Sequence, residues 1–199
     1  MIRAKKAFGV SPIEEPPVPL RTKTALGPRG RAWPGVAREG GPVDVFVQEH
    51  VRDLLGVSWG FSREVEEGGF LFGEVHRDAD APSRWLVVVT EVIRAEHTEE
   101  APDALVFSPE SFASMRRHAE AKRDGASILG WFHTHLVAGP EDRGLSVVDR
   151  DLHFSTFRRP WQVAALVCVD PARDPEGREV SFFAREGDFL VPCAVEVLA

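Results

Sequence analysis

Apolar runs rich in β-branched residues are the feature that most constrains the fold of this chain. Arg84–Ile93 contains the succession Leu-Val-Val-Val-Thr-Glu-Val, which is typical of a strand. Gln162–Val169 and Val180–Ala184 are similar, and Val43–Val47 has the alternation of a half-buried strand. Segments with helical spacing separate these runs irregularly. The pattern therefore favours a mixed α/β sheet over a strictly parallel, doubly wound one.

Capping and spacing signals predict three helices between the strands. Ser108-Pro109-Glu110 combines a favoured N-cap, a proline at the first helical position and an acid in the first turn, and Gly125 lies just past the expected end. Gln48–Leu55 has helical spacing, and a third helix is expected over 146–157, capped by Ser146. Further strands are expected over 66–73, over 127–132, and over Phe189–Val197, which would close the sheet.

Residues 1–42 differ in composition from the rest of the chain. They contain seven prolines and no sustained periodicity, which is typical of an extended or partly disordered arm. Residues 1–40 carry a net charge of about +5, which leaves about −12 for the remainder. We therefore expect a proline-rich basic arm over 1–42 and one folded domain over 43–199, long enough to bury a core.

Composition also limits the compartment and the partners. No apolar run is long enough to span a bilayer, and the basic start Met1–Lys6 lacks the apolar stretch of a secretory signal, so no membrane is expected. Cys168 and Cys193 lie in apolar runs without CxxC spacing, which predicts reduced core residues in a cytoplasmic protein. The acidic domain argues against nucleic acid as a partner. Its charge suits either a basic protein substrate or solubility alone.

Two histidines stand at the end of the predicted strand over 127–132. His133 and His135 share one face of an extended chain, whereas Thr134 points to the other. Asp149, in the first turn of the following helix, would complete a set of two imidazoles and one carboxylate. A catalytic zinc uses such a set when its fourth position stays open for water, whose pKa it lowers to about 7. The sequence therefore predicts a metal-dependent hydrolase.

A hydrolase also needs a proton carrier and a group that stabilises the oxyanion. Glu66 and Glu67 are both candidates for the carrier, since both lie beside a strand that could abut the histidine strand. Ser146, three residues before Asp149, could donate to the oxyanion. Each pattern also has an ordinary structural interpretation. Ser-x-x-Asp is a common helix cap, and two glutamates before a strand are typical of a solvated loop.

Taken in order, these segments resemble the JAMM (JAB/MPN) metallopeptidase family. Its signature is a Glu ahead of a glycine-containing strand, then His-Ser/Thr-His, then Ser-x-x-Asp. Here the three parts are Glu66–Gly73, Gly130–His135 and Ser146–Asp149, and the resemblance spans residues 43 to about 199. The family glutamate lies three residues before the first glycine of a Gly-x-x-x-Gly pair, a register that selects Glu66 over Glu67.

The resemblance implies a fold, a cofactor and an activity. The fold is a curved mixed β-sheet flanked by helices, an α/β (α+β) arrangement. One zinc ion with a bound water would be held by His133, His135 and Asp149, with Glu66 as general base and acid and Ser146 helping to stabilise the oxyanion. Active members cleave isopeptide or peptide bonds after the C-terminal Gly-Gly of ubiquitin or a ubiquitin-like protein.

The compact domain is most similar to prokaryotic, deubiquitinase-like members of the family. That likeness implies a ubiquitin-like protein or its conjugates as substrate, with E1- and E2-like proteins as further partners. The loop Leu136–Leu145 is about three residues longer than the commonest family spacing, and Leu136 replaces the usual proline. Glu141, Asp142 and Arg143 are candidate contacts in that loop. The alternatives are a sulfur-carrier-processing peptidase, a phage-tail-type peptidase and a non-catalytic scaffold.

Overall fold

A mixed β-sheet forms the framework of the protein. The computed structural model describes residues 18–31, 33, 40–96, 98–101, 104–122, 126–137, 144–176 and 178–199. Within them, nine strands pair in the order β10-β9-β8-β7-β3-β4-β2-β11, with β1 attached to β3, and β5 and β6 form a separate hairpin. The strands are β1 (Leu20–Arg21), β2 (Val43–Gln48), β3 (Gly68–Asp78), β4 (Trp85–Arg94), β5 (Thr98–Ala101), β6 (Ala104–Phe107), β7 (Ser127–Leu136), β8 (Val163–Val169), β9 (Glu179–Glu186), β10 (Phe189–Pro192) and β11 (Ala194–Leu198).

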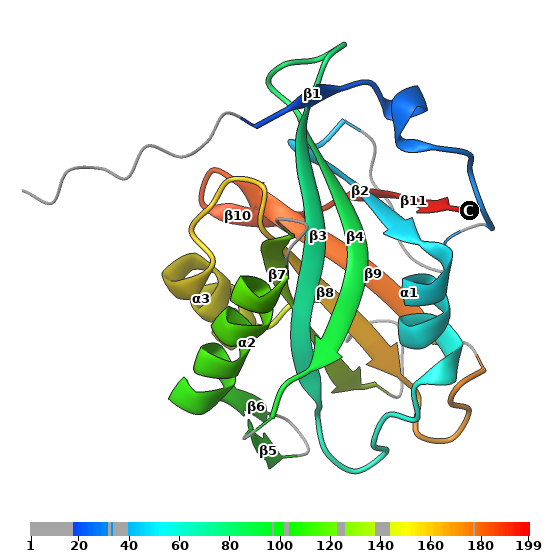
Figure 1. Ribbon diagram of the computed structural model, residues 1–199. Coiled ribbons are helices and arrows are strands. Elements are labelled where there is room, and N and C mark those ends of the chain that lie inside the picture. Colours follow the sequence, from blue (N-terminus) through cyan, green and yellow to red (C-terminus); the bar gives the residue numbers. More distant parts are fainter. Residues whose placement is uncertain are drawn as a thin grey trace, which may run out of the picture.

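Helices cover both faces of this sheet. The described helices are α1 (Glu49–Asp53), α2 (Pro109–Ala121), α3 (Val147–Thr156), a 3-10 helix (Lys23–Leu26) and a π-helical turn (Leu54–Ser58). Figure 1 shows α2 and α3 on one side of β3 and β4, and α1 on the other. Each side buries its own apolar cluster, so the neighbours Phe70 and Leu71 belong to different clusters, as the period of two along a strand requires.

The end of the chain corrects the expectation of one strand over Phe189–Val197. The segment breaks at Cys193 into β10, which pairs antiparallel with β9, and β11, which pairs parallel with β2. These two strands stand at opposite ends of the strand order, although Pro192 and Ala194 are two residues apart. Two residues span at most about 7 Å. The sheet therefore curls until its two edges come together at this corner.

Three other elements differ from the sequence-based expectation. β3 begins at Gly68 rather than at residue 66 and continues to Asp78. The β5–β6 hairpin is missing from the prediction, because the Glu, Ala, Pro and Asp residues over 99–103 are weak strand formers. The helix expected to stop at Gly56 instead passes through it in the π-helical turn. Arg178 accounts for that extension, since it donates to the carbonyls of Leu55 and Trp59.

The described part of the N-terminal segment runs along the domain and contacts β3, β11 and β9. β1 pairs with Arg77 and Asp78 at the far end of β3, and Gly30 N–H donates to β11 at 2.7 Å. Trp33 Nε1 donates to the Val180 carbonyl at 2.7 Å. In Figure 1, β1 lies at the top whereas β3 starts at the bottom. Residues 18–31 and Trp33 are thus bound to the domain surface.

The two cysteines lie in the core, as predicted. Cys168 and Cys193 are both buried and neither forms a disulfide. Burial raises the pKa of the Cys193 thiol, and the nearby Asp44 carboxylate raises it further. The thiol therefore stays protonated and behaves as a small apolar group.

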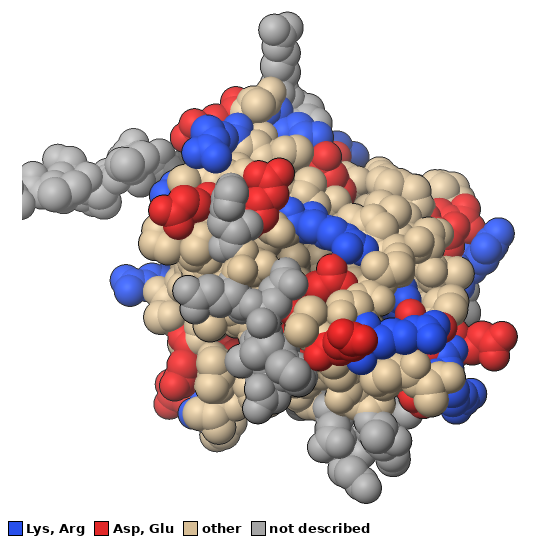
Figure 2. Space-filling view, turned by 90° about the horizontal axis from the view of Figure 1, so that it is seen from below, with Lys and Arg blue, Asp and Glu red and all other residues tan. Residues whose placement is uncertain are grey.

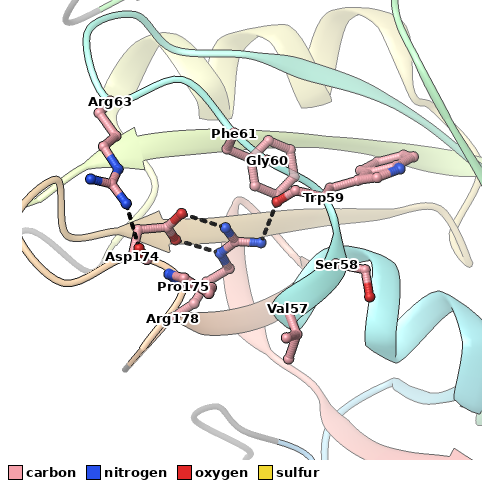
Figure 3. A pocket seen from close by; sticks show the side chains of 9 residues that line it. All are labelled: Val57, Ser58, Trp59, Gly60, Phe61, Arg63, Asp174, Pro175 and Arg178. Atoms are coloured by element: carbon pink, nitrogen blue, oxygen red, sulfur yellow. Dashed lines mark hydrogen bonds and ion pairs between the residues drawn. The ribbon is translucent and has the colours of Figure 1, made fainter.

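A buried ion pair fastens the π-helical turn to the segment before β9. Arg178 Nε and Nη2 donate to the Asp174 carboxylate at 2.7 and 2.6 Å, and Nη1 donates to Leu55 O and Trp59 O at 3.2 and 2.9 Å. Both charged residues are buried. The pair lines a cavity of about 280 Å³, whose lining residues are drawn in Figure 3. The Asp174 and Arg178 side chains are bonded to each other, and Arg178 also bonds the carbonyls of Leu55 and Trp59. We therefore give these charged groups a structural role. The cavity is lined by Val57, Ser58, Trp59, Gly60, Phe61, Arg63, Asp174, Pro175 and Arg178.

Replacing Arg178 by leucine is expected to lower the free energy of unfolding by about 3–5 kcal/mol, because it leaves the Asp174 carboxylate buried without its cation. Urea unfolding followed by circular dichroism measures the loss. Arg173→Leu is the matched control, since Arg173 is exposed in the same turn, and we expect a change within about 0.5 kcal/mol. Equal stability of the two variants would contradict the role given to the ion pair.

Candidate metal centre

The antiparallel pairing of β3 with β7 places a glutamate opposite the histidine pair. Gly68, the first residue of β3, pairs with His133. Glu67, the residue before it, accepts from Thr134 N–H at 2.7 Å through its carbonyl. Residues directly opposite each other on antiparallel strands share a face. The next pair in this register is Glu66 and His135, on the face that also bears His133, and Glu66 Oε1 lies 4.0 Å from His135 Nε2. Pairing thus brings together groups almost seventy residues apart in sequence.

The two imidazoles and Asp149 converge on one point. The Nε2 atoms of His133 and His135 lie 2.8 Å apart. Asp149 Oδ1 is 3.2 Å from His133 Nε2, and Asp149 Oδ2 is 3.3 Å from His135 Nε2. Glu66, His133 and His135 also offer ligand atoms that all lie within 4.8 Å of one another. These groups could hold a metal ion, with Asp149 as the carboxylate nearer to the histidines.

The first turn of α3 fixes the Asp149 carboxylate. Ser146 is the N-cap of this helix, and its Oγ accepts from Asp149 N–H at 3.2 Å. In return, Ser146 N–H donates to Asp149 Oδ2 at 2.7 Å, which completes a capping box. The sequence pattern thus acts as a helix cap and also holds a carboxylate beside the histidines. The hydrogen bonds that cap α3 are therefore the same ones that hold the Asp149 carboxylate in place.

Electrostatics keep the centre in the state that binds cations. Burial alone would raise the pKa of Asp149, but hydrogen bonds from His133 and His135 and from Ser146 hold that pKa well below its usual range. Burial lowers the pKa of His133, although the Asp149 carboxylate opposes that shift. Asp149 is therefore ionised and His133 tends to be neutral near pH 7, the protonation states in which carboxylates and imidazoles bind metals.

Glu67 faces away from the histidines. Its carboxylate accepts from Arg94 Nη1 at 2.9 Å and from the backbone N–H of Ser62. Its backbone N–H donates to Thr134 Oγ1 at 2.8 Å. Of the two candidate glutamates, the structure therefore places Glu66 at the centre and Glu67 on the opposite side of the strand.

A layer of aromatic rings supports the centre from behind. Trp131 stacks on His133 with a ring separation of 4.8 Å, and its Nε1 donates to His153 Nδ1 at 3.3 Å. His153 lies one turn after Asp149 on α3 and is fully buried. Burial lowers its pKa to about 4, with a smaller contribution from Arg185. His153 was not predicted from the sequence, although its i, i+4 spacing from Asp149 was a usable signal.

Two buried ring nitrogens of this aromatic layer, His133 Nδ1 and His153 Nε2, have no hydrogen-bond partner among the described residues. A histidine that binds metal through Nε2 commonly donates its Nδ1 proton to a carboxylate or carbonyl. His133 has no such partner here. On the Nδ1 side, the aromatic stack with Trp131 rather than a hydrogen bond supports the ring.

Part of the predicted binding surface lies outside the described residues. Glu141, Asp142 and Arg143 belong to that part. The cavity of Figure 3 does not extend the centre, because its Trp59 and Phe61 pack on Phe132, which faces the α1 side of β7. The substrate groove expected from the long loop therefore stays a prediction.

The surface around the start of β3 has a mixed character. Figure 2 shows this end of the molecule, where acidic and basic side chains are interspersed with uncharged surface. The most exposed apolar side chains near the centre are Val147 and Val148, at 64% and 71%, in the first turn of α3. Within the described residues, no helix combines the length and the apolar character needed to cross a membrane.

Comparison with known proteins gives information on the fold alone. No protein-family profile matches the chain, and no curated protein matches it. Among solved structures, the chain is similar to the solution structure of protein DSY2949 from Desulfitobacterium hafniense, with a TM-score of 0.51 and 18% sequence identity. The match covers 77% of this chain and 92% of that one. At this identity the likeness shows a shared fold.

The buried His153 is expected to make the protein less stable in acid. The unfolded chain binds the proton near pH 6.5 but the folded chain only near pH 4, so stability is lost as pH falls through this interval. The loss amounts to about 3 kcal/mol. Urea unfolding of metal-free protein between pH 7.5 and 4 measures it, with His153→Gln as the comparison. Parallel stability curves for the two proteins would exclude this role of His153.

Proposed function

We propose that this protein is a zinc-dependent peptidase or isopeptidase that cleaves after the C-terminal Gly-Gly of a ubiquitin-like protein. The observation that carries the proposal is the convergence of Glu66, His133, His135 and Asp149 at the meeting point of β3, β7 and α3. A zinc hydrolase needs a set of ligands and a proton carrier. The two imidazoles and the adjacent carboxylate would be the ligands, and the second carboxylate, slightly farther away, would be the carrier.

The spacing of the donor atoms supports a tetrahedral zinc site. Zinc bonds of 2.0–2.1 Å at tetrahedral angles place neighbouring ligand atoms about 3.3 Å apart. The Asp149 oxygens lie 3.2 and 3.3 Å from the two Nε2 atoms. The 2.8 Å between the Nε2 atoms of His133 and His135 is shorter, and two ring nitrogens at that distance need a proton or a cation between them. The residues present therefore fit a zinc ion.

In this proposal Glu66 carries the proton. A bound zinc ion would supply Lewis acidity and lower the pKa of a coordinated water. Glu66 is buried beside His135, and its carboxylate lies outside the closer set formed by Asp149 and the histidines. It accepts a proton from the water that adds to the scissile carbonyl carbon. It then delivers that proton to the amine nitrogen as the C–N bond breaks.

Ser146 has a structural task and a proposed chemical one. Its Oγ lone pair accepts from Asp149 N–H, which leaves the hydroxyl proton available to a developing oxyanion. The exposed side of Ser146 and the neighbouring Val147 and Val148 give a substrate access to this first turn. We assign Ser146 both the helix cap and a share in oxyanion stabilisation.

The substrate class rests on the resemblance of segments 66–73, 130–135 and 146–149 to the JAMM signature. The two cysteines form no disulfide, which agrees with a reducing compartment, and we propose the cytoplasm. E1- and E2-like proteins of a bacterial modification or anti-phage pathway are the proposed partners. Release of a small adduct from a sulfur-carrier protein is the related activity that the same chemistry would allow.

Glu66→Gln is expected to retain one zinc ion per chain and to lose cleavage by a factor of about 10²–10⁴, because the amide cannot accept the proton. The assay follows, by mass spectrometry, a ubiquitin-like protein extended by a short peptide beyond Gly-Gly. Glu64→Gln is the matched control, since Glu64 is exposed in the same loop. Wild-type protein without stoichiometric zinc would overturn the metal centre, and equal cleavage by Glu66→Gln would remove Glu66 from its role.

A pair of serine variants separates the cap from the chemistry. Ser146 and Ser108 each accept at 3.2 Å from the N–H three residues ahead, so each alanine variant should lose about 1 kcal/mol of stability. Only Ser146→Ala should also lower kcat, by about tenfold or more. Thermal unfolding and the cleavage assay measure the two effects. Equal kcat in both variants would reduce Ser146 to a helix cap.

A further inference from the structure

Thr134 stands between the two histidines but faces the opposite side of β7. It is fully buried, and its hydroxyl oxygen accepts from Glu67 N–H at 2.8 Å. Its own N–H donates to Glu67 O at 2.7 Å. These two hydrogen bonds, here named the Thr134–Glu67 clamp, join the residue between the histidines to the residue next to Glu66.

The clamp replaces the last step of the β-ladder. In a regular antiparallel pair, Glu67 N–H would donate to the backbone carbonyl of Thr134. The side-chain hydroxyl accepts instead, and β3 is regular only from Gly68 onward. Glu66 therefore lies beyond the ladder, between the clamp at Glu67 and the hydrogen bond from Val65 N–H to Ser62 Oγ at 3.1 Å. A side chain without a hydroxyl would leave the partly buried N–H of Glu67 without this acceptor.

The carboxylate of Glu67 provides a second attachment. It accepts from Arg94 Nη1 at 2.9 Å and from Ser62 N–H, while Arg94 Nη2 donates to Gly60 O at 3.0 Å. The Arg94 guanidinium also lies over the Trp59 ring at 5.1 Å. The loop that precedes β3 is thereby bound to the end of β4 on the side away from the histidines.

We infer that Thr134 and Glu67 are positioning residues that hold the Glu66 carboxylate beside the metal centre. This inference rests on the proposed function, because it assigns Glu66 the proton transfer. Neither residue contacts the reacting atoms. Thr134 acts through the Glu67 backbone, so the hydroxyl at position 134 is required, whereas the methyl group is not.

Thr134→Val is expected to lower kcat about 10- to 100-fold with KM and zinc content unchanged, since a shift of about 1 Å in a catalytic group costs this much. Thr134→Ser keeps the hydroxyl and should restore kcat. Thr90→Val, the same exchange on β4, is the matched control. In the Glu66→Gln background Thr134→Val should have almost no further effect, because both changes act on one group. Independent, multiplying losses would overturn the inference.

Two measurements on the folded protein do not depend on the substrate. With Co²⁺ as the probe metal, the pseudocontact shift of the Glu66 side-chain carbon should change in Thr134→Val and be retained in Thr134→Ser. Exchange of the Glu67 amide should become about tenfold faster in Thr134→Val alone. Unchanged shifts and exchange would refute the clamp even if the enzyme is active. If the wild type binds Co²⁺ but cleaves nothing, while Thr134→Val shows both effects relative to it, the proposed function is refuted and the clamp still holds.

Discussion

The antiparallel pairing of β3 with β7 is the constraint on which the candidate centre depends. Side chains alternate along both strands, so a slip of one residue would bring Glu67 rather than Glu66 to the histidine face. Glycines allow the irregularities of this region. Gly130 has a φ of +149°, and a Cβ there would lie 1.8 Å from Val163 O on the neighbouring strand. The register of β3 against β7 shifts between Leu71 and Phe72. From Leu71 back to Gly68 the pairing is regular, and it ends with Gly68 opposite His133.

The second constraint is the beginning of α3, where folding and site use the same atoms. Asp149 Oδ2 accepts from Ser146 N–H and lies 3.3 Å from His135 Nε2. A carboxylate at a helix N-terminus is favoured by the helix dipole, and here the same position keeps it ionised beside two imidazoles. The helix therefore supplies a carboxylate of fixed orientation. A flexible loop could supply the charge but would lose more conformational entropy on ordering it.

The sequence predicts the local part of this arrangement well and the long-range part poorly. The histidine pair, the cap at Ser146 and the strand at 85–94 follow from alternation and capping, which act over a few residues. The choice between Glu66 and Glu67 depends on strand register, which the residues alone left open. The break at Cys193 was missed because the curl of the whole sheet, rather than local propensity, places β10 and β11 at opposite edges. The hairpin β5–β6 was missed because residues 99–103, which include most of its first strand and the residues that follow it, are weak strand formers.

Residues outside the motif determine whether the motif can work. His133 and His135 face the α2 and α3 side, so Phe132 and Thr134 must face the other layer. Phe132 packs on Trp59 and Phe61 there, and Thr134 bonds Glu67, so that layer fixes the strand that carries the imidazoles. A replacement of Trp59 or Phe61 would leave every motif residue in place and would still move the donor atoms. Metal centres with bonds near 2 Å tolerate little movement, and the packing of the opposite layer is therefore part of the site.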